Sequence, residues 1–97
     1  MSVKFSNGEI RENGQLLGKL SYNDEIRNRS GSLLGKTHDE EIRDRSGSLV
    51  GKVRDGKVYS KSGSSVGRVG DYMIDGMQHE KDVNIVAAYH FLVKKFL

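Results

Sequence analysis

A unit of about 16 residues recurs along most of this chain and constrains its fold more than any other feature. Residues 25–37 and 41–53 are nearly identical and lie 16 residues apart. A shorter copy precedes them at residues 9–20, and a diverged copy follows at residues 57–69. Residues 73–75 resemble the start of a further copy, and residues 3–5 resemble the end of an earlier one. Such self-similarity indicates one small structural unit stacked on copies of itself.

Each copy is predicted to form a β-hairpin, because short aliphatic runs alternate with clusters of Gly, Asn, Asp and Ser. In the first copy Asn13-Gly14 favours a two-residue turn of type I′. In the third copy residues 45–47 fit a three-residue loop in which Gly47 takes the left-handed conformation. The length difference falls within the turn, so Arg11 faces Leu16 just as Arg43 faces Leu49. Strand pairing demands such a constant register.

The alternation within each hairpin predicts one apolar and one polar face. The apolar face carries aliphatic residues at a spacing of 16, with a second set paired opposite them: Ile10, Ile26, Ile42, Val58 and Ile74, facing Leu17, Leu34, Val50 and Val66. The polar face carries a ladder at the same spacing: Arg11, Arg27, Arg43 and Tyr59.

Recurring glycines within the second strands need an explanation, because Gly weakens a strand interior. We predict a β-bulge at each of them, Gly18, Gly35, Gly51 and Gly67. The bulges bring Leu20, Val53 and Val69 onto the apolar face, and Lys19, Lys36, Lys52 and Arg68 onto the polar face beside Glu9, Glu25 and Glu41. The alternative is a three-residue loop at residues 54–56 with no bulge.

The C-terminal stretch changes from a period of 2 to a period of 3.6 and predicts one amphipathic helix from about Glu80. We divide the chain into a hairpin sheet at residues 1–78 and a helix at residues 79–97, packed on its own sheet or on that of a partner. Glu80 and Asp82 in the first turn and Lys94 and Lys95 in the last suit the helix dipole. The predicted helix is about 27 Å long, and no stretch is long and apolar enough to span a bilayer.

A flat sheet of about ten strands would be roughly 45 Å wide, which is more than this helix can cover. The remaining apolar face could stay open, curl through sheet twist, or bury against another copy. We favour self-association through the apolar face and the helix, because an uncovered apolar face promotes it. The fold class predicted is therefore mainly β, a single-layer antiparallel meander of hairpin repeats with one C-terminal helix.

Composition restricts the functional classes only in part. The 97 residues carry a net charge of +3 and no Cys, which excludes disulfides and thiolate metal sites. Residues 1–8 lack the apolar core of a signal peptide. The sequence as given thus predicts a cytoplasmic protein, whereas a chain from which an export segment had been removed would be secreted.

The spacing of turn and bulge glycines, as from Gly47 to Gly51, resembles that of single-layer antiparallel β-sheet proteins of gut bacteria, which are built from tandem β-hairpins. The resemblance covers residues 3–75. It implies a single-layer sheet, a role connected with complex carbohydrates, and an exposed Tyr patch, for which Tyr59 is in register.

The polar face offers the candidate ligand-binding residues, because regularly spaced cations suit regularly spaced phosphates, sulfates or uronates. They are Arg27, Arg43, Tyr59, Lys36, Lys52 and Arg68. The alternative is a solvated face neutralised by its own Glu ladder.

Nothing in the sequence predicts catalysis, a metal site or a cofactor. His38, His79 and His90 lack ligand spacing, no Gly-rich phosphate loop follows a strand, and no Ser lies in a nucleophile elbow. We therefore predict a non-enzymatic binding or assembly module associated with polysaccharide. The alternatives are a structural homo-oligomer and a binder of anionic polymer such as nucleic acid.

Overall fold

The chain forms one antiparallel sheet of nine strands, which follow each other in sequence order. The computed structural model describes residues 3–97; Met1 and Ser2, the start of the predicted sheet unit, lie outside the described residues. The strands are β1 Val3–Ser6, β2 Glu9–Glu12, β3 Gln15–Leu20, β4 Glu25–Asn28, β5 Leu33–His38, β6 Glu41–Asp44, β7 Leu49–Arg54, β8 Lys57–Ser60 and β9 Ser65–Arg68. A 3₁₀ turn η1 (Val69–Tyr72), an α-helix α1 (Asp82–Ala88) and a π-helical turn η2 (Tyr89–Val93) follow. The predicted fold class is confirmed.

The turns have the predicted chemistry. Asn13 and Gly14 have φ angles of 52° and 85°, as a type I′ turn requires, and Gly47 has a φ of 91°. Arg54 pairs with Lys57, and Asp55 and Gly56 both have positive φ. The connection between β7 and β8 is thus a two-residue turn, and the alternative three-residue loop is wrong.

Bulges occur in all four hairpins, one residue earlier than the simplest pairing predicts. Arg43 pairs with Leu49, whereas Ile42 pairs with Gly51, so that Val50 is the extra residue. The first hairpin does the same, with Ile10 opposite Gly18. The predicted pairs of Ile10 with Leu17 and Ile42 with Val50 are therefore wrong by one residue, because the bulge precedes the glycine.

The predicted apolar face is buried. Ile10, Ile26, Ile42 and Val58 are fully inaccessible, and Leu20, Val53, Val69 and Ile74 are nearly so. The four predicted partners are the bulge residues, which lie less deep. Leu17 and Val50 pack partly against the core, whereas Val66 is 38% exposed.

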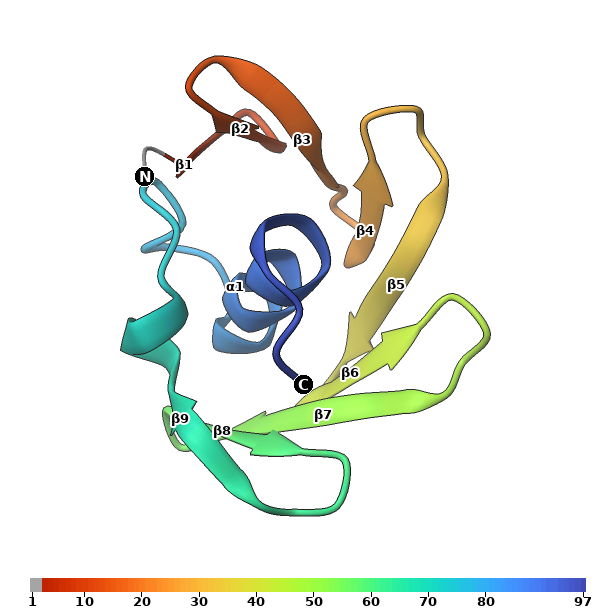
Figure 1. The fold of residues 1–97 in the computed structure, drawn as a ribbon, viewed down its shortest axis with the longest axis vertical. Helices are drawn as coiled ribbons and strands as arrows, with labels where there is room; N and C mark the ends of the chain where they lie inside the picture. The colour runs from red at the N-terminus through yellow and green to blue at the C-terminus, as the bar shows by residue number, and fades with distance from the viewer. Residues whose placement is uncertain (1–2) are drawn as a thin grey trace.

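The sheet curls around the chain's own C-terminal helix, and this helix covers the apolar face of the sheet (Figure 1). The molecule measures 35 × 27 × 20 Å, well below the width of a flat sheet. Of the three possibilities predicted for the apolar face, curling through sheet twist is the one observed, and the curl packs this face against α1. The expectation of self-association is thereby left without the open apolar face on which it rested.

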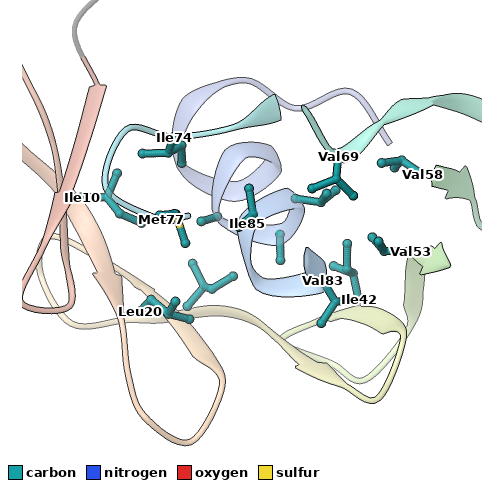
Figure 2. Packing of buried hydrophobic residues seen from close by; sticks show 14 residues of the cluster. Ile10, Leu20, Ile42, Val53, Val58, Val69, Ile74, Met77, Val83 and Ile85 are labelled. Atoms are coloured by element: carbon teal, nitrogen blue, oxygen red, sulfur yellow. The ribbon is translucent and has the colours of Figure 1, made fainter. Parts of the chain in front are cut away.

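Helix α1 lies inside this curl, and only its first residue, Asp82, is exposed. All six residues from Val83 to Ala88 are buried, and Ile85 packs among side chains from several hairpins (Figure 2). The predicted C-terminal helix is confirmed, but it differs from the expectation in two respects: residues 83–88 are buried around the whole helix rather than on one face, and the helix is shorter. Helical structure ends at Val93, and the backbone of Lys94 is extended. Only Asp82 remains in a terminal turn as predicted.

The bulge glycines have a second role, which is to make room for side chains of the C-terminal segment. A Cβ added at Gly35 would lie 2.4 Å from the Phe91 ring, and one at Gly18 would lie 2.5 Å from Leu92. Gly51 faces Leu97 in the same way. Gly67 faces the Tyr72 hydroxyl, which donates a hydrogen bond to the Val66 carbonyl. Each hairpin thus offers a hollow at its glycine, and a large side chain fills it.

The two ends of the repeat array meet and occupy a fifth position in the curl. At the open end of each hairpin, the inward residue of the second strand donates a backbone hydrogen bond across to the first: Leu20 to Gly8, Thr37 to Asp24, Val53 to Glu40 and Val69 to Gly56, at 2.8–3.0 Å. Phe5 on β1 is the equivalent inward residue, and its N–H donates to the Asp75 carbonyl at 2.7 Å. Residues 3–5 and 73–75, the two partial copies, therefore occupy the place of a fifth hairpin, although their bridge between Lys4 and Asp75 is parallel.

One polar network fixes the start of the helix. The buried Asn84 accepts a hydrogen bond from the Thr37 hydroxyl and donates one to Asp24 at 3.0 Å. Lys81 forms an ion pair with Asp24 at 3.1 Å. The Asn84 amide and, after it, Lys81 lower the pKa of the Asp24 carboxyl. The buried side-chain amide of Asn84 therefore has partners at the open end of the β4–β5 hairpin.

The chain end after the helix is held by a buried histidine. Nδ1 of His90 accepts the backbone N–H groups of Phe96 and Leu97 at 3.1 and 3.2 Å. Burial, with a further contribution from Lys95, lowers the pKa of His90 below its ordinary value. The neutral ring is thus the form that the fold requires, since a protonated Nδ1 cannot accept these bonds.

We expect the free energy of unfolding to fall as pH is lowered through about 6.5. The unfolded chain takes up a proton on His90 before the folded one does, so acid favours unfolding. Urea titrations between pH 8 and pH 5 measure this, and His90→Gln should flatten the profile relative to the wild type. His38→Gln is the matched control, because His38 is exposed and lies outside the core. A profile unchanged by His90→Gln would contradict the assignment.

Candidate functional site

The outer face of the curled sheet carries all six predicted ligand-binding residues. Cross-strand pairing places Lys36 beside Arg43 and Lys52 beside Tyr59. Lys36 also faces Glu25, and Arg68 faces Lys57. The face therefore follows the predicted ladders, with one cation of each second strand set between two neighbouring hairpins.

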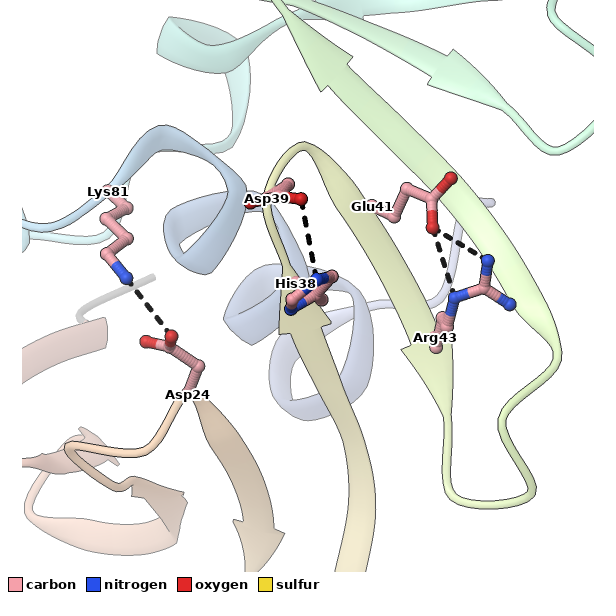
Figure 3. A network of polar contacts seen from close by, with 6 residues as sticks. All are labelled: Asp24, His38, Asp39, Glu41, Arg43 and Lys81. Carbon is pink, nitrogen blue, oxygen red and sulfur yellow. Dashed lines mark hydrogen bonds and ion pairs between the residues drawn. The ribbon is translucent and has the colours of Figure 1, made fainter.

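The arginines of the first three hairpins are engaged within their own hairpins. Arg43 Nη2 lies 2.7 Å from Glu41 Oε1 (Figure 3), and its Nη1 donates to the Gly47 carbonyl at 2.8 Å. Arg27 makes the same two contacts with Glu25 and Gly31, both at 2.9 Å. The first hairpin repeats them with Arg11, Glu9 and Gly14. We call this arrangement the Glu–Arg clamp, and it holds the loop at the tip of the hairpin.

Each clamp neutralises its own charge. The hydrogen bond from Arg43 is the main reason why the pKa of Glu41 is lowered, with added effects of Arg43 and Lys52 charge. At least a third of the Arg43 side chain remains exposed, so the gain in stability is modest. Arg27 and Arg43 are therefore less available to a ligand than their regular spacing suggests.

The cations of the second strands are free of such partners. Lys19, Lys36, Lys52 and Arg68 are exposed, and the ion pairs found among residues 3–97 involve none of them. They provide an outward cation in each hairpin. Of the predicted site residues, Lys36, Lys52 and Arg68 are thus the ones without an ion-pair partner in the described part of the chain, although the charge of Lys52 contributes to the lowered pKa of Glu41.

The fourth hairpin departs from the pattern at both clamp positions. Lys57 stands where the other hairpins have Glu, and Tyr59 stands where they have Arg. Lys57 pairs with Arg54 on β7 and with Arg68 on β9. The equivalent row in the third hairpin is His38, Glu41 and Lys52, with the carboxylate in the middle. Three cations on adjacent strands replace it.

A hollow of about 590 Å³ lies at this place on the outer face. Its lining comes from β8, β9 and the following turn: Lys57, Tyr59, Ser65, Gly67, Arg68 and Asp71. A second hollow of about 480 Å³ shares Tyr59 and is lined in addition by Lys52, Arg54 and three carboxylates, those of Asp39, Glu40 and Glu41. The Tyr59 side chain, which is half-buried, therefore borders both hollows.

Sequence reasoning missed Lys57 and Arg54 as members of this site. The repeat itself contained the signal, since Lys57 is the position at which a strict Glu spacing of 16 ends. Arg54 pairs with Lys57 only if the turn has two residues, and the sequence left open whether it has two or three. Asp71, whose carboxylate accepts the Arg68 backbone N–H at 3.1 Å, had no signal in the repeat.

The described part of the chain shows neither a metal-binding cluster nor a membrane-spanning helix. Residues 3–97 hold no group of three or more His, Asp or Glu side chains placed to bind a metal ion. None of the helices described there is long and apolar enough to cross a membrane.

Comparison with protein families decides how this fold is classified. A family model described as "5-fold beta-flower protein" matches residues 3–92. The chain belongs to this beta-flower family. Four hairpins and the position shared by the two chain ends give five units around the helix, in agreement with that description. The predicted resemblance to single-sheet proteins of tandem hairpins is confirmed at the level of the fold. Comparison with curated proteins and with solved structures gave no significant match.

Proposed function

We propose that this beta-flower protein is a non-enzymatic module that binds an acidic polysaccharide on its outer face. The supporting observation is the set of exposed cations, Lys19, Lys36, Lys52 and Arg68, which recur once per hairpin and lack partners among the described ion pairs. A polymer with regularly repeated sulfates or carboxylates would contact several of them at once. The matched family is described by its shape alone, and no reaction is named there.

A rigid, open surface suits binding rather than catalysis. The inner face is filled by the helix, and the two hollows beside Tyr59 lie on the outer face and admit water. Among residues 3–97, every buried side-chain nitrogen or oxygen has a hydrogen-bond partner, and Asn84 and His90 use theirs to hold the helix and the chain end. The outer cations are held on strands, where their spacing is fixed.

Titration with heparin tests this function. We expect binding that weakens as salt rises, and a Lys36→Gln/Lys52→Gln variant whose salt dependence has a slope lower by about one for each lysine removed. Isothermal titration at several salt concentrations measures both quantities. Lys94→Gln/Lys95→Gln is the matched control, because it removes the same charge from the exposed chain end.

Two results would contradict the proposal. Absence of heparin binding at low salt would remove the outer face as a polyanion site. An equal loss in both double variants would show that net charge alone attracts the polymer.

A further inference from the structure

The fourth hairpin lacks the Glu–Arg clamp and still forms the same paired strands as the other three. The first three hairpins keep Glu and Arg two residues apart, and the pair holds the tip loop. In the fourth, Lys57 and Tyr59 replace both members together. The inward residue between them is unaffected, since Val58 is fully buried like Ile42. The exchange of this pair therefore alters the outer surface.

The substitution concentrates like charges. Arg54, Lys57 and Arg68 are consecutive cross-strand partners on β7, β8 and β9, and all three are exposed. Like charges directly opposite each other destabilise a sheet. Within the described residues no carboxylate forms an ion pair with them. Asp71 lines the same hollow, but its carboxylate accepts the backbone N–H of Arg68 and forms no ion pair with the three side chains. A bound anion would relieve the repulsion among them.

An aromatic ring lies in the next row. Tyr59 is flanked by Lys52 and Ser65 as cross-strand partners. This row lies two residue pairs along the strands from the three cations, which makes it the next outward row. The hollow of about 590 Å³ runs past this ring to Lys57 and Arg68. The site therefore combines a flat apolar surface, a hydroxyl and a multiple cation contact.

Resting on the proposed function, we infer that the fourth hairpin is its recognition centre and takes a sulfated or phosphorylated sugar ring. The Tyr59 ring packs against the sugar, and Arg54, Lys57 and Arg68 bind the acid group. A single aromatic side chain suits one sugar ring. Binding of single-stranded nucleic acid uses successive aromatic platforms, whereas the other ladder positions here hold clamped arginines.

Two variants separate the ring from the charges. Tyr59→Ala leaves the net charge unchanged and should weaken binding of a sulfated hexasaccharide about tenfold, as loss of one stacked ring typically does. Lys57→Glu/Tyr59→Arg restores the clamp of the other hairpins and should abolish the site while retaining the fold. Isothermal titration gives affinity, and thermal unfolding monitored by circular dichroism verifies that each variant is folded.

A reciprocal variant tests for gain of binding. Glu41→Lys/Arg43→Tyr transplants the diverged pair into the third hairpin, where Lys52 already provides a neighbouring cation. We expect the number of hexasaccharides bound per chain to rise from one to two. The desulfated hexasaccharide and a single-stranded oligonucleotide of equal charge are the comparison ligands, and both should bind at least tenfold more weakly.

The outcomes distinguish this inference from the proposed function. If heparin binds the wild type but Tyr59→Ala and the restored clamp bind as well as the wild type, the recognition centre is wrong and the outer-face function stands. Tighter binding of the oligonucleotide would overturn the sugar assignment. If neither heparin nor the hexasaccharide binds the wild type, both proposals fail.

Discussion

Gly35→Ala should destabilise the protein by about 3 kcal/mol, the upper part of the range for overpacked cores. The added Cβ would lie 2.4 Å from the Phe91 ring and 2.6 Å from the Arg43 carbonyl oxygen. A side chain can rotate away, but the carbonyl belongs to the neighbouring strand β6. The strain therefore cannot be relieved without separating two paired strands. Urea unfolding of the wild type and the variant measures the difference.

Gly70→Ala is the matched control for this substitution. No atom lies within 4 Å of a Cβ built at Gly70, which is exposed in η1. We expect its unfolding free energy to stay within about 0.5 kcal/mol of the wild-type value. The double variant Gly35→Ala/Phe91→Ala should remain unstable, because the contact with the Arg43 carbonyl persists. A Gly35→Ala protein as stable as Gly70→Ala would show that the bulge glycines are not hollows for the helix segment.

Ile42→Ala should lower the unfolding free energy by about 3–4 kcal/mol. Ile42 is fully buried between the sheet and α1, and truncation leaves a cavity that the surrounding hairpins cannot close. A domain of this size has a total stability on the order of 5–15 kcal/mol, so the loss is a large fraction.

Leu49→Ala on the same hairpin is its control. Leu49 pairs with Arg43 on the outer face and is half-buried, so its truncation should cost less than about 1 kcal/mol. Both variants remove aliphatic side chains of equal size, and their difference reports which face is inside. Equal losses would contradict the assignment of faces.

The sheet was predictable because a repeat tests its own register. Arg11 and Arg43 keep the same cross-strand partners despite loops of different length, which only paired strands explain. The glycine bulges followed from one conflict, the need to place Val53 and Val58 on the same face, and the structure pairs these two residues. The exact position of each bulge was not predictable. The glycine is needed where the C-terminal side chains pack closely against the strand, and the bulge residue is the one before it.

The curl and the buried helix were not predicted, for a physical reason. A width calculated for flat strands ignores the accumulated twist, and this led to an expected partner copy. The nearly continuous apolar run from Val83 to Ala88 was the available signal, since a helix apolar on all sides is a buried one. The period of Ile85, Tyr89 and Leu92 instead predicts a helix that is apolar on one face only.

The candidate site was predictable only as a face. Regular spacing identified the Arg and Lys ladders, but sequence does not show that Arg27 and Arg43 are occupied by carboxylates two residues earlier. Because these arginines are occupied, the candidate site lies where the regular spacing of the ladder is broken, at Lys57 and Tyr59.

The backbone hydrogen bond between Phe5 and Asp75 has a consequence for how this molecule comes apart. In a linear array of repeats, each unit touches only its neighbours, and the terminal ones fray independently. Here the first and last segments are joined, so losing any one hairpin exposes the same central helix to water. Melting should consequently be all-or-none. We expect the slowest event in folding to be the meeting of chain segments some seventy residues apart, because closing so long a loop costs entropy before the contact forms.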